Sequence, residues 1–203
     1  KELNDMGPWM VDLMYKTYAP VLGNNFEDSI ITSSLTSELM INRVKDMISY
    51  AQGKYPNLKC VGYEAGDSDS QKTYNAAVTL MTANPNMKVI LSNASDALGP
   101  ICEAIAAEGK IGKVYGTGMT TPNLAKPGYR NGTILGGAML WAPATWAEFA
   151  VTVCNELIEG KQFKKGGNWS VPGFPNVEMT SDDVIVYSGL QEFTKSNIND
   201  FDF

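Results

Sequence analysis

Short apolar runs alternate with helical patterns along most of the chain. The runs at 26–32, 58–65 and 89–91 each end in small polar residues. After each run, apolar residues recur every three or four positions, which is the period of an amphipathic helix. Strands that alternate with helices predict an α/β fold, with a Rossmann-like parallel sheet covered by helices on both faces.

The same pattern predicts the individual elements. We expect strands at 26–32, 58–65, 89–91, 113–117, 133–140 and 184–187. We expect helices at 8–22, from 37 to about 55, from about 70, from 97, at 123–129 and at 142–160. The tail from Lys161 is polar and rich in turn residues, and no internal repeat or flexible linker interrupts the chain.

Polar side chains follow the strands at the points where helices begin. Asn93, Ser95 and Asp96 come directly after the run at 89–91. In open parallel sheets, ligands bind outside the carboxyl ends of the strands. We therefore predict that these three residues hydrogen-bond the hydroxyl groups of a ligand. The small polar turn from Ser34 to Thr36 would close the rim of the same site.

Two interpretations are open for the acidic residues near these turns, which are Glu64, Asp67, Asp69 and Asp96. In the first interpretation, these residues cap helices and solvate the rim of the site. In the second, some of them accept hydrogen bonds from a neutral ligand. The DSDS sequence at 67–70 lacks the glycine and the bidentate glutamate of a calcium loop, so a helix cap is favoured there, with Ser68 or Ser70 as the capping residue.

An aromatic residue near these turns points to a sugar as the ligand. Trp141 follows a strand, and there it would provide a flat surface for the C–H face of a sugar. The alternative is that Trp141 is a core residue covering the end of the sheet.

The composition excludes several classes of enzyme. The chain has no histidine, which removes Ser-His-Asp and Cys-His systems, imidazole zinc sites and the usual near-neutral base. The sequence GTGMTTPN at 116–123 lacks the third glycine of a dinucleotide loop. We therefore expect no enzyme activity, no cofactor and no metal. A net charge of −6 argues against a nucleic-acid or anionic-membrane partner.

The cysteines and the first residue carry two further expectations. Cys60, Cys102 and Cys154 are odd in number, widely spaced and set in apolar patterns, which predicts buried free thiols and no disulfide framework. The chain begins at Lys1 and not at Met, which we take to indicate a processed or trimmed piece.

Four segments together resemble a known family. They are ILSNASDALGP at 90–100, VYGTGMTTPN at 114–123, NGTILGGAMLW at 131–141 and FTKSNINDFDF at 193–203. This pattern is similar to that of the periplasmic sugar-binding proteins of ABC importers, in the branch of the autoinducer-2-binding and rhamnose-binding proteins. The similarity runs from about Phe26 to Phe203, and the terminal segment is its most specific part.

The resemblance implies a fold of two Rossmann-like lobes that are joined by hinge strands and close on a ligand. Residues 1–140 would be the second lobe, and residues 141–203 the crossover helix and tail that complete the lobes. The first lobe would be missing from this chain. The apolar stripe of the helix at 142–160 would then be covered by a second copy of the chain or by a complementing N-terminal fragment, or would stay exposed.

The resemblance also implies a ligand different from autoinducer-2. Leu39 and Met40 stand where that branch has an Asp-Gln pair, and Asn93 and Ser95 stand in place of its Pro-x-Ala sequence. A deoxy sugar such as rhamnose would suit these positions, because its methyl group needs an apolar wall. That wall would consist of Leu39, Met40, Met119 and Trp141.

The function implied is that of an extracytoplasmic solute-binding protein. It would bind a monosaccharide and deliver it to an ABC permease, in a periplasm or lipid-anchored on the outer face of a Gram-positive membrane. A ligand-sensing domain of a receptor or transcriptional regulator is an alternative with the same fold. An enzyme on a flavodoxin-like fold is a third, which the missing histidine and phosphate loop disfavour.

Overall fold

The structure is a computed structural model that describes residues 2–167, 169–175, 177–181, 184–187 and 189–203. It consists of two compact units. The larger unit contains residues 6–140 and 192–203, and the smaller unit contains residues 1–5 and 141–191. The last twelve residues of the chain thus belong with the larger unit. The division into a second lobe at 1–140 and a crossover helix and tail at 141–203 stays a prediction.

The elements follow one another in regular alternation through most of the chain. The strands are β1 Phe26–Thr32, β2 Leu58–Ala65, β3 Met87–Ser92, β4 Tyr115–Met119, β5 Ala138–Trp141, β6 Val177–Ser181, β7 Val184–Tyr187 and β8 Leu190–Phe193. The helices are α1 Glu2–Leu22, α2 Glu38–Lys54, α3 Ser70–Ala83, α4 Leu98–Ala107, α5 Pro122–Asn131 and α6 Pro143–Ile158, with a short 3₁₀ helix η1 at Ile198–Asp200.

The main sheet has the strand order β2-β1-β3-β4-β5-β8. Strands β1 to β5 pair in parallel, which confirms the predicted α/β class. From β1 the chain crosses to β2 on one side and then to β3 on the other. The strand order therefore reverses between β1 and β3, and this is the point where sheets of this kind bind ligands.

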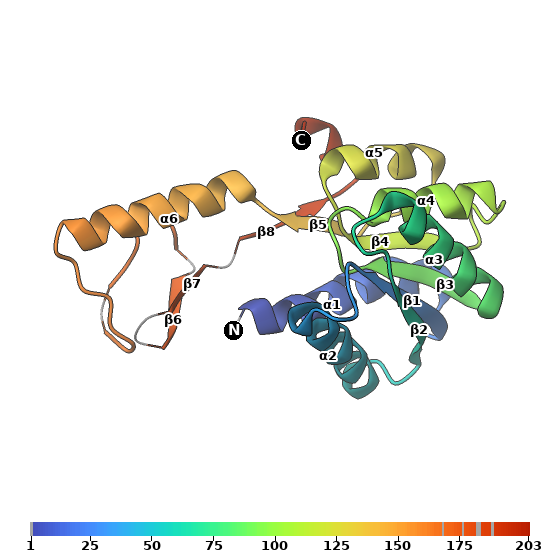
Figure 1. Cartoon of the computed structure of the whole chain (residues 1–203), viewed down its shortest axis with the longest axis horizontal. Helices are drawn as coiled ribbons and strands as arrows, with labels where there is room; N and C mark the ends of the chain where they lie inside the picture. Colours follow the sequence, from blue (N-terminus) through green and yellow to red (C-terminus); the bar gives the residue numbers. More distant parts are fainter. Residues whose placement is uncertain (1, 168, 176, 182–183, 188) are drawn as a thin grey trace. The chain divides into compact units, whose positions relative to one another are not determined.

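Helices cover both faces of the parallel sheet (Figure 1). Helices α3 and α4 share one core cluster with Ile31 of β1 and Ile90 of β3. Helices α1 and α2 lie on the opposite face, where the ring of Tyr15 stacks on those of Phe26 and Tyr55. Strand β3 is buried on both faces, which explains why the sequence at 89–91 is a continuous apolar run and not an alternating one.

Several predicted boundaries are wrong. Helix α1 begins at Glu2, six residues earlier than predicted, with Pro8 and Pro20 inside it. Strand β4 begins and ends two residues later than expected. The strand expected at 133–140 is reduced to β5, because Gly137 has a positive φ of +75° that breaks the extended run. Strands β6 and β8 were not predicted.

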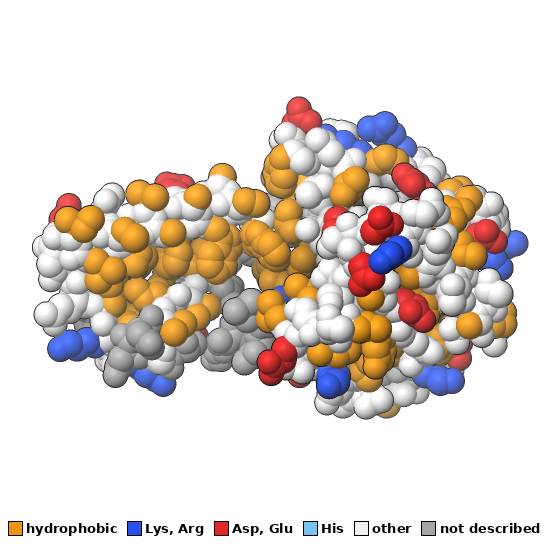
Figure 2. Space-filling model, in the orientation of Figure 1, with side chains coloured by type: hydrophobic (Ala, Val, Ile, Leu, Met, Phe, Trp, Pro, Cys, Tyr) orange, Lys and Arg blue, Asp and Glu red, His pale blue; other side chains and the backbone are white. Residues whose placement is uncertain are grey.

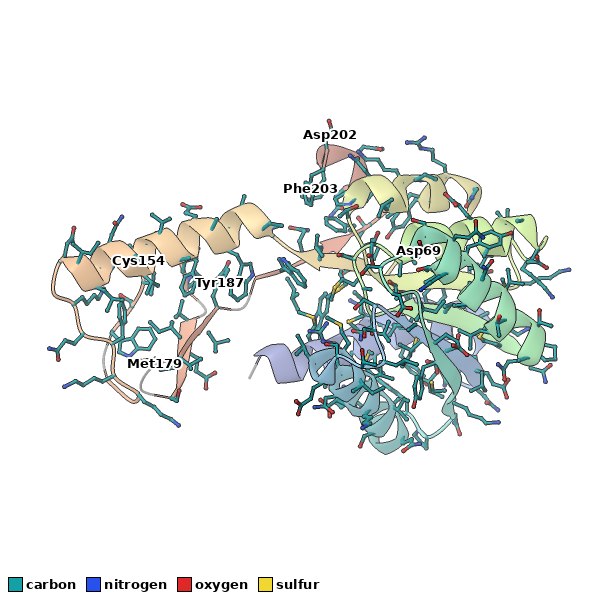
Figure 3. All side chains as sticks on the ribbon, viewed as in Figure 1. Asp69, Cys154, Met179, Tyr187, Asp202 and Phe203 are labelled. Atoms are coloured by element: carbon teal, nitrogen blue, oxygen red, sulfur yellow. The ribbon has the colours of Figure 1, made fainter. Side chains whose placement is uncertain are left out.

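In the smaller unit, one face of α6 packs against the tail that follows it. Phe149 of α6 is buried in a cluster whose other buried members are Phe163, Val171, Phe174 and Met179. The ring of Phe149 lies 5.2 Å from that of Phe174 and 5.1 Å from that of Tyr187. Figure 3 labels Met179 and Tyr187 on this tail. The tail thus covers part of the apolar surface of α6.

The other face of α6 carries an apolar stripe that is exposed within its own unit (Figure 2). Val151, Leu157 and Ile158 are 60%, 52% and 83% exposed. Ala147, Ala150 and Cys154 are exposed beside them. We call these six residues the exposed stripe of α6. The prediction that Cys154 is buried is therefore wrong, whereas Cys102 is buried and Cys60 half-buried.

The C-terminus is attached to α5 of the larger unit. The Asn123 amide donates a hydrogen bond to the Phe203 carbonyl at 3.2 Å. Lys126 Nζ donates to the Phe201 carbonyl at 2.6 Å, and the Tyr129 hydroxyl donates to that of Phe193 at 2.6 Å. Asp202 and Phe203 are labelled there in Figure 3. These bonds explain why residues 192–203 belong to the larger unit.

Tyr18 connects helix α1 to strand β4 and to the segment before β5. We expect Tyr18→Phe to destabilise the protein. Its buried hydroxyl donates to the Gly116 carbonyl at 2.8 Å and accepts a bond from the Leu135 amide at 3.4 Å. Removing the hydroxyl leaves these groups unpaired, at a cost of about 1–3 kcal/mol. Urea unfolding measures the loss. The control is Tyr63→Phe, at a tyrosine that is 42% exposed; an equal loss in both variants would contradict this explanation.

Candidate functional site

The candidate site lies at the carboxyl ends of β1 and β3, where the strand order reverses. Asn93 follows β3, and its amide donates to the Ile31 carbonyl at 2.7 Å. Its side-chain Nδ2 donates to Thr32 Oγ1 at 3.1 Å and to the Met40 carbonyl at 3.4 Å. Asn93 is fully buried. It therefore connects β1, β3 and the first turn of α2, and its role in ligand binding stays a prediction.

Arg43 of α2 is a member of this site that the sequence analysis missed. It is 5% exposed, and its Nη1 donates a hydrogen bond of 3.4 Å to Asn93 Oδ1. Its Nε is buried without a partner. Burial lowers the pKa of the Arg43 guanidinium, but arginine stays charged in proteins. Its spacing was the feature of the sequence that could have identified Arg43 as buried. Arg43 lies three residues after Met40 and four before Met47, on the apolar face of α2.

The loop after β3 contacts the loop after β4. The Ser95 carbonyl accepts a hydrogen bond from the Thr121 amide at 3.3 Å. The side chain of Ser95 is half-buried and that of Asp96 is exposed, so both are within reach of solvent at this edge. Met119 ends β4 and is 2% exposed, so it lies beneath the surface of the edge. Ser95 and Asp96 thus follow β3, whereas Met119 lies within the neighbouring strand β4.

The rim after β1 is a turn organised by a serine. Ser34 Oγ accepts hydrogen bonds from the amides of Thr36 and Ser37, each at 3.2 Å. Thr36 is exposed, Leu39 is 50% exposed and Met40 is half-buried. The turn before α2 thus presents a hydroxyl group to solvent, and the first turn of α2 presents apolar surface.

The acidic residues after β2 stabilise a helix terminus. Asp69 Oδ1 accepts a hydrogen bond from the Lys72 amide at 2.8 Å, which caps α3. Asp67 forms an exposed ion pair of 3.1 Å with the Lys72 side chain. The preference for a helix cap over a calcium loop is therefore confirmed, with Asp69 in the capping position in place of Ser68 or Ser70.

Three helices of the larger unit begin at this edge without a side-chain cap. The residues preceding them are Ser37 for α2, Ala97 for α4 and Thr121 for α5, and none makes a capping hydrogen bond. The first amides of a helix point out of its N-terminus and carry partial positive charge. Together with Arg43, these termini make the edge electrostatically favourable for an oxygen-rich or anionic group.

Trp141 is the last residue of β5 and the first of the smaller unit, and it is 36% exposed. Its predicted role as a platform for a sugar stays a prediction. Among the described side chains, no group of three or more His, Cys, Asp and Glu residues is placed to hold a metal ion. In the same part of the chain, no helix combines the length and hydropathy needed to cross a membrane.

Comparison with known families identifies the domain. A family model described as a periplasmic binding protein domain matches residues 5–162, which is more than half of the chain. The chain belongs to this family. The periplasmic binding protein domain is a ligand-binding domain and not an enzyme, in agreement with the expectation drawn from the missing histidine.

Solved structures share the fold over the whole chain. A sugar ABC transporter protein from Actinomyces odontolyticus superposes with a TM-score of 0.83 at 21% identity, covering 100% of this chain and 64% of that one. LsrB from Clostridium saccharobutylicum, in complex with AI-2, gives a TM-score of 0.79 at 21% identity, with 99% and 68% covered.

A third similar structure is a solute-binding protein from Clostridium phytofermentas with bound L-rhamnose. It superposes with a TM-score of 0.78 at 19% identity, covering 98% of this chain and 64% of that one. At these identities the similarity shows the fold. The chain spans about 64% of the length of two of these three structures and 68% of the other.

Proposed function

We propose that this periplasmic binding protein domain is part of an extracytoplasmic solute-binding protein that delivers a monosaccharide to an ABC permease. The observation that carries the proposal is the polar cluster of Thr32, Asn93 and Arg43 at the point where the strand order reverses. In sheets of this kind a ligand binds at that point. The three similar structures include proteins with bound AI-2 and L-rhamnose, which supports a small polyol as the ligand.

The proposal includes the first lobe of the family fold, most of which would lie outside this chain. The larger unit would be one lobe, and the smaller unit would complete the other. The exposed stripe of α6 supports this, because a helix with one apolar face unpaired needs a further surface to bury it. This chain covers 64% of the length of two of the similar structures, so more than a third of each lies outside the matched part. Ligand binding between two lobes would close them, and the closed form would be recognised by the permease.

Individual roles follow from the positions of the side chains. Ser95 and Asp96 would hydrogen-bond hydroxyl groups, and Trp141 would stack on the apolar face of the sugar. Leu39 and Met40 would contact a methyl group from the first turn of α2, with Met119 supporting the floor from below. A deoxy sugar such as L-rhamnose fits these roles, since it combines hydroxyl groups with one methyl group.

A thermal-shift panel of pentoses, hexoses and deoxyhexoses tests this function. We expect one sugar to raise the melting temperature of the protein at its native length. At a concentration one hundred times its dissociation constant, a ligand stabilises the folded state by about 2.7 kcal/mol. The present chain alone should show a smaller shift, because it supplies the site residues of one lobe.

A variant of Trp141, the residue proposed to stack on the sugar, tests whether the shift comes from binding at this site. Trp141→Ala should reduce the shift caused by the sugar without changing the melting temperature in its absence by a comparable amount, because the side chain is 36% exposed. If neither a sugar of this panel nor a sugar acid raises the melting temperature of the protein at its native length, the proposed function is wrong, and a role in sensing a different class of ligand gains weight.

A further inference from the structure

Arg43 is a buried cation that has no acidic partner among the described residues. It is 5% exposed, and its one hydrogen bond to the described residues is the 3.4 Å contact with Asn93. Burying a charge is costly unless it is paired and hydrogen-bonded, so buried arginines normally face a carboxylate or a phosphate. A guanidinium has five N–H donors, of which only one is used here. The unused donors therefore point to a partner that the described residues do not provide.

The neighbouring acidic residues do not fill this role. Glu38 in the first turn of α2 and Asp96 after β3 are both exposed, and neither forms an ion pair with Arg43 among the described interactions. The contact with Asn93 is a weak substitute, since 3.4 Å is long for a hydrogen bond and the amide oxygen is neutral. A carboxylate would be a stronger acceptor, because charge-assisted hydrogen bonds are shorter and about twice as strong.

Arg43 lies at the point of the sheet where a ligand group is expected to bind. Its guanidinium reaches Asn93, which follows β3, and Asn93 in turn binds the Met40 carbonyl in the first turn of α2. This is the point between β1 and β3 where the sheet is expected to bind its ligand. The uncapped N-terminus of α2 lies at the same edge and also favours negative charge.

We propose that the solute carries a carboxylate group, which the Arg43 guanidinium binds together with the N-terminal amides of α2. The ligand class is thus a sugar acid and not a neutral sugar. This inference rests on the proposed function, because it uses the same site at the carboxyl ends of β1 and β3. A 6-deoxy skeleton remains compatible, since an aldonic acid such as L-rhamnonate carries its carboxylate and its methyl group at opposite ends.

Two matched pairs of ligands test the inference by calorimetry on the protein at its native length. L-rhamnonate is compared with L-rhamnose, and D-galacturonate with D-galactose. We expect at least one acid to bind about tenfold or more tightly than its neutral partner, as a charge-assisted and bidentate contact allows. The preference should weaken at high salt, because part of the attraction is Coulombic.

Variants at Arg43 test whether this residue causes the preference for the acid over the neutral sugar. Arg43→Met removes the charge and keeps an unbranched side chain, and we expect it to weaken binding of the acid at least about tenfold more than it weakens binding of the neutral sugar. Arg43→Lys should retain part of the preference. Lys45→Met is the matched control, since Lys45 is an exposed cation two residues away on the same helix. Circular dichroism checks that each variant is folded.

The outcomes separate this inference from the proposed function. An acid preference that is lost in Arg43→Met and kept in Lys45→Met supports the inference. A neutral sugar that binds as tightly as its acid overturns the inference and leaves the proposed function in place. Failure of all four ligands and of the wider sugar panel overturns both. The comparison of wild-type affinities decides the matter even if Arg43→Met does not fold.

Discussion

Gly118→Ala is expected to lower the free energy of unfolding by at least about 3 kcal/mol, from a strained backbone and a steric clash together. Gly118 lies in β4 with φ +102°, a conformation that residues with a side chain rarely adopt. A Cβ at this position would collide with the backbone carbonyl oxygen of Ser92 in the neighbouring strand β3. Neither backbone can move without breaking the ladder between these strands.

Urea unfolding of Gly118→Ala and Gly112→Ala separates the two causes. Gly112 also has a positive φ, of +76°, but a Cβ there would meet no atom within 4 Å. Gly112→Ala should therefore cost only the backbone strain, which is about 1–2 kcal/mol. Equal losses in the two variants would show that the clash with Ser92 contributes nothing. Because Gly118 lies next to the loop that carries Asn93, ligand binding should weaken in Gly118→Ala as well.

Asp28→Asn is expected to stabilise the protein above neutral pH and to have little effect at pH 4. Asp28 in β1 is 4% exposed, and its Oδ1 is buried without a hydrogen-bond partner. Burial raises the pKa of the Asp28 carboxyl from 3.8 to about 7, against a smaller opposing effect from a backbone hydrogen bond. Folding therefore favours the protonated form of this carboxyl.

The direction of the pH effect follows from this raised pKa. Between pH 3.8 and about 7, the folded state holds a proton that the unfolded state releases, so stability falls as the pH rises through this range. Above pH 7 the full cost is present, about 4 kcal/mol for a shift of this size. Asparagine cannot ionise, so Asp28→Asn removes this loss.

Urea unfolding at pH 4, 6 and 8 measures the effect. The difference in free energy of unfolding between Asp28→Asn and wild type should grow from near zero to several kcal/mol over this range. Asp46→Asn, at an exposed position on α2, has the same change in net charge and serves as the control. A difference that does not depend on pH would show that Asp28 is not protonated in the folded state near neutrality.

Asp28 and Arg43 illustrate what local sequence patterns leave out. Asp28 lies in FEDSIIT, between Phe26 and Ile30, in a run that reads as a strand whether or not the carboxyl is buried. Arg43 lies within an equally clear helical pattern. Burial depends on the elements that pack over a residue from elsewhere in the chain, and no window of neighbouring residues contains that information.

The surroundings of helix α6 also could not be predicted from local sequence patterns. The sequence predicts the helix and its apolar residues, but not that Phe149 packs against its own tail while Val151, Leu157 and Ile158 stay exposed. The tail was read as irregular apart from the strand at 184–187. Its fold depends on aromatic contacts between residues up to about forty positions apart, such as that of Phe149 with Tyr187.

The sequence by itself determined that this protein is an α/β domain with its polar residues at the carboxyl ends of parallel strands, because strand and helix periods are local properties. The segments quoted from it also led to the family whose model matches residues 5–162. Only the tertiary structure placed β1 between β2 and β3, which is the observation behind the candidate site. Only the structure joined Arg43 to Asn93, fifty residues away, because that contact depends on how strands far apart in the chain become neighbours.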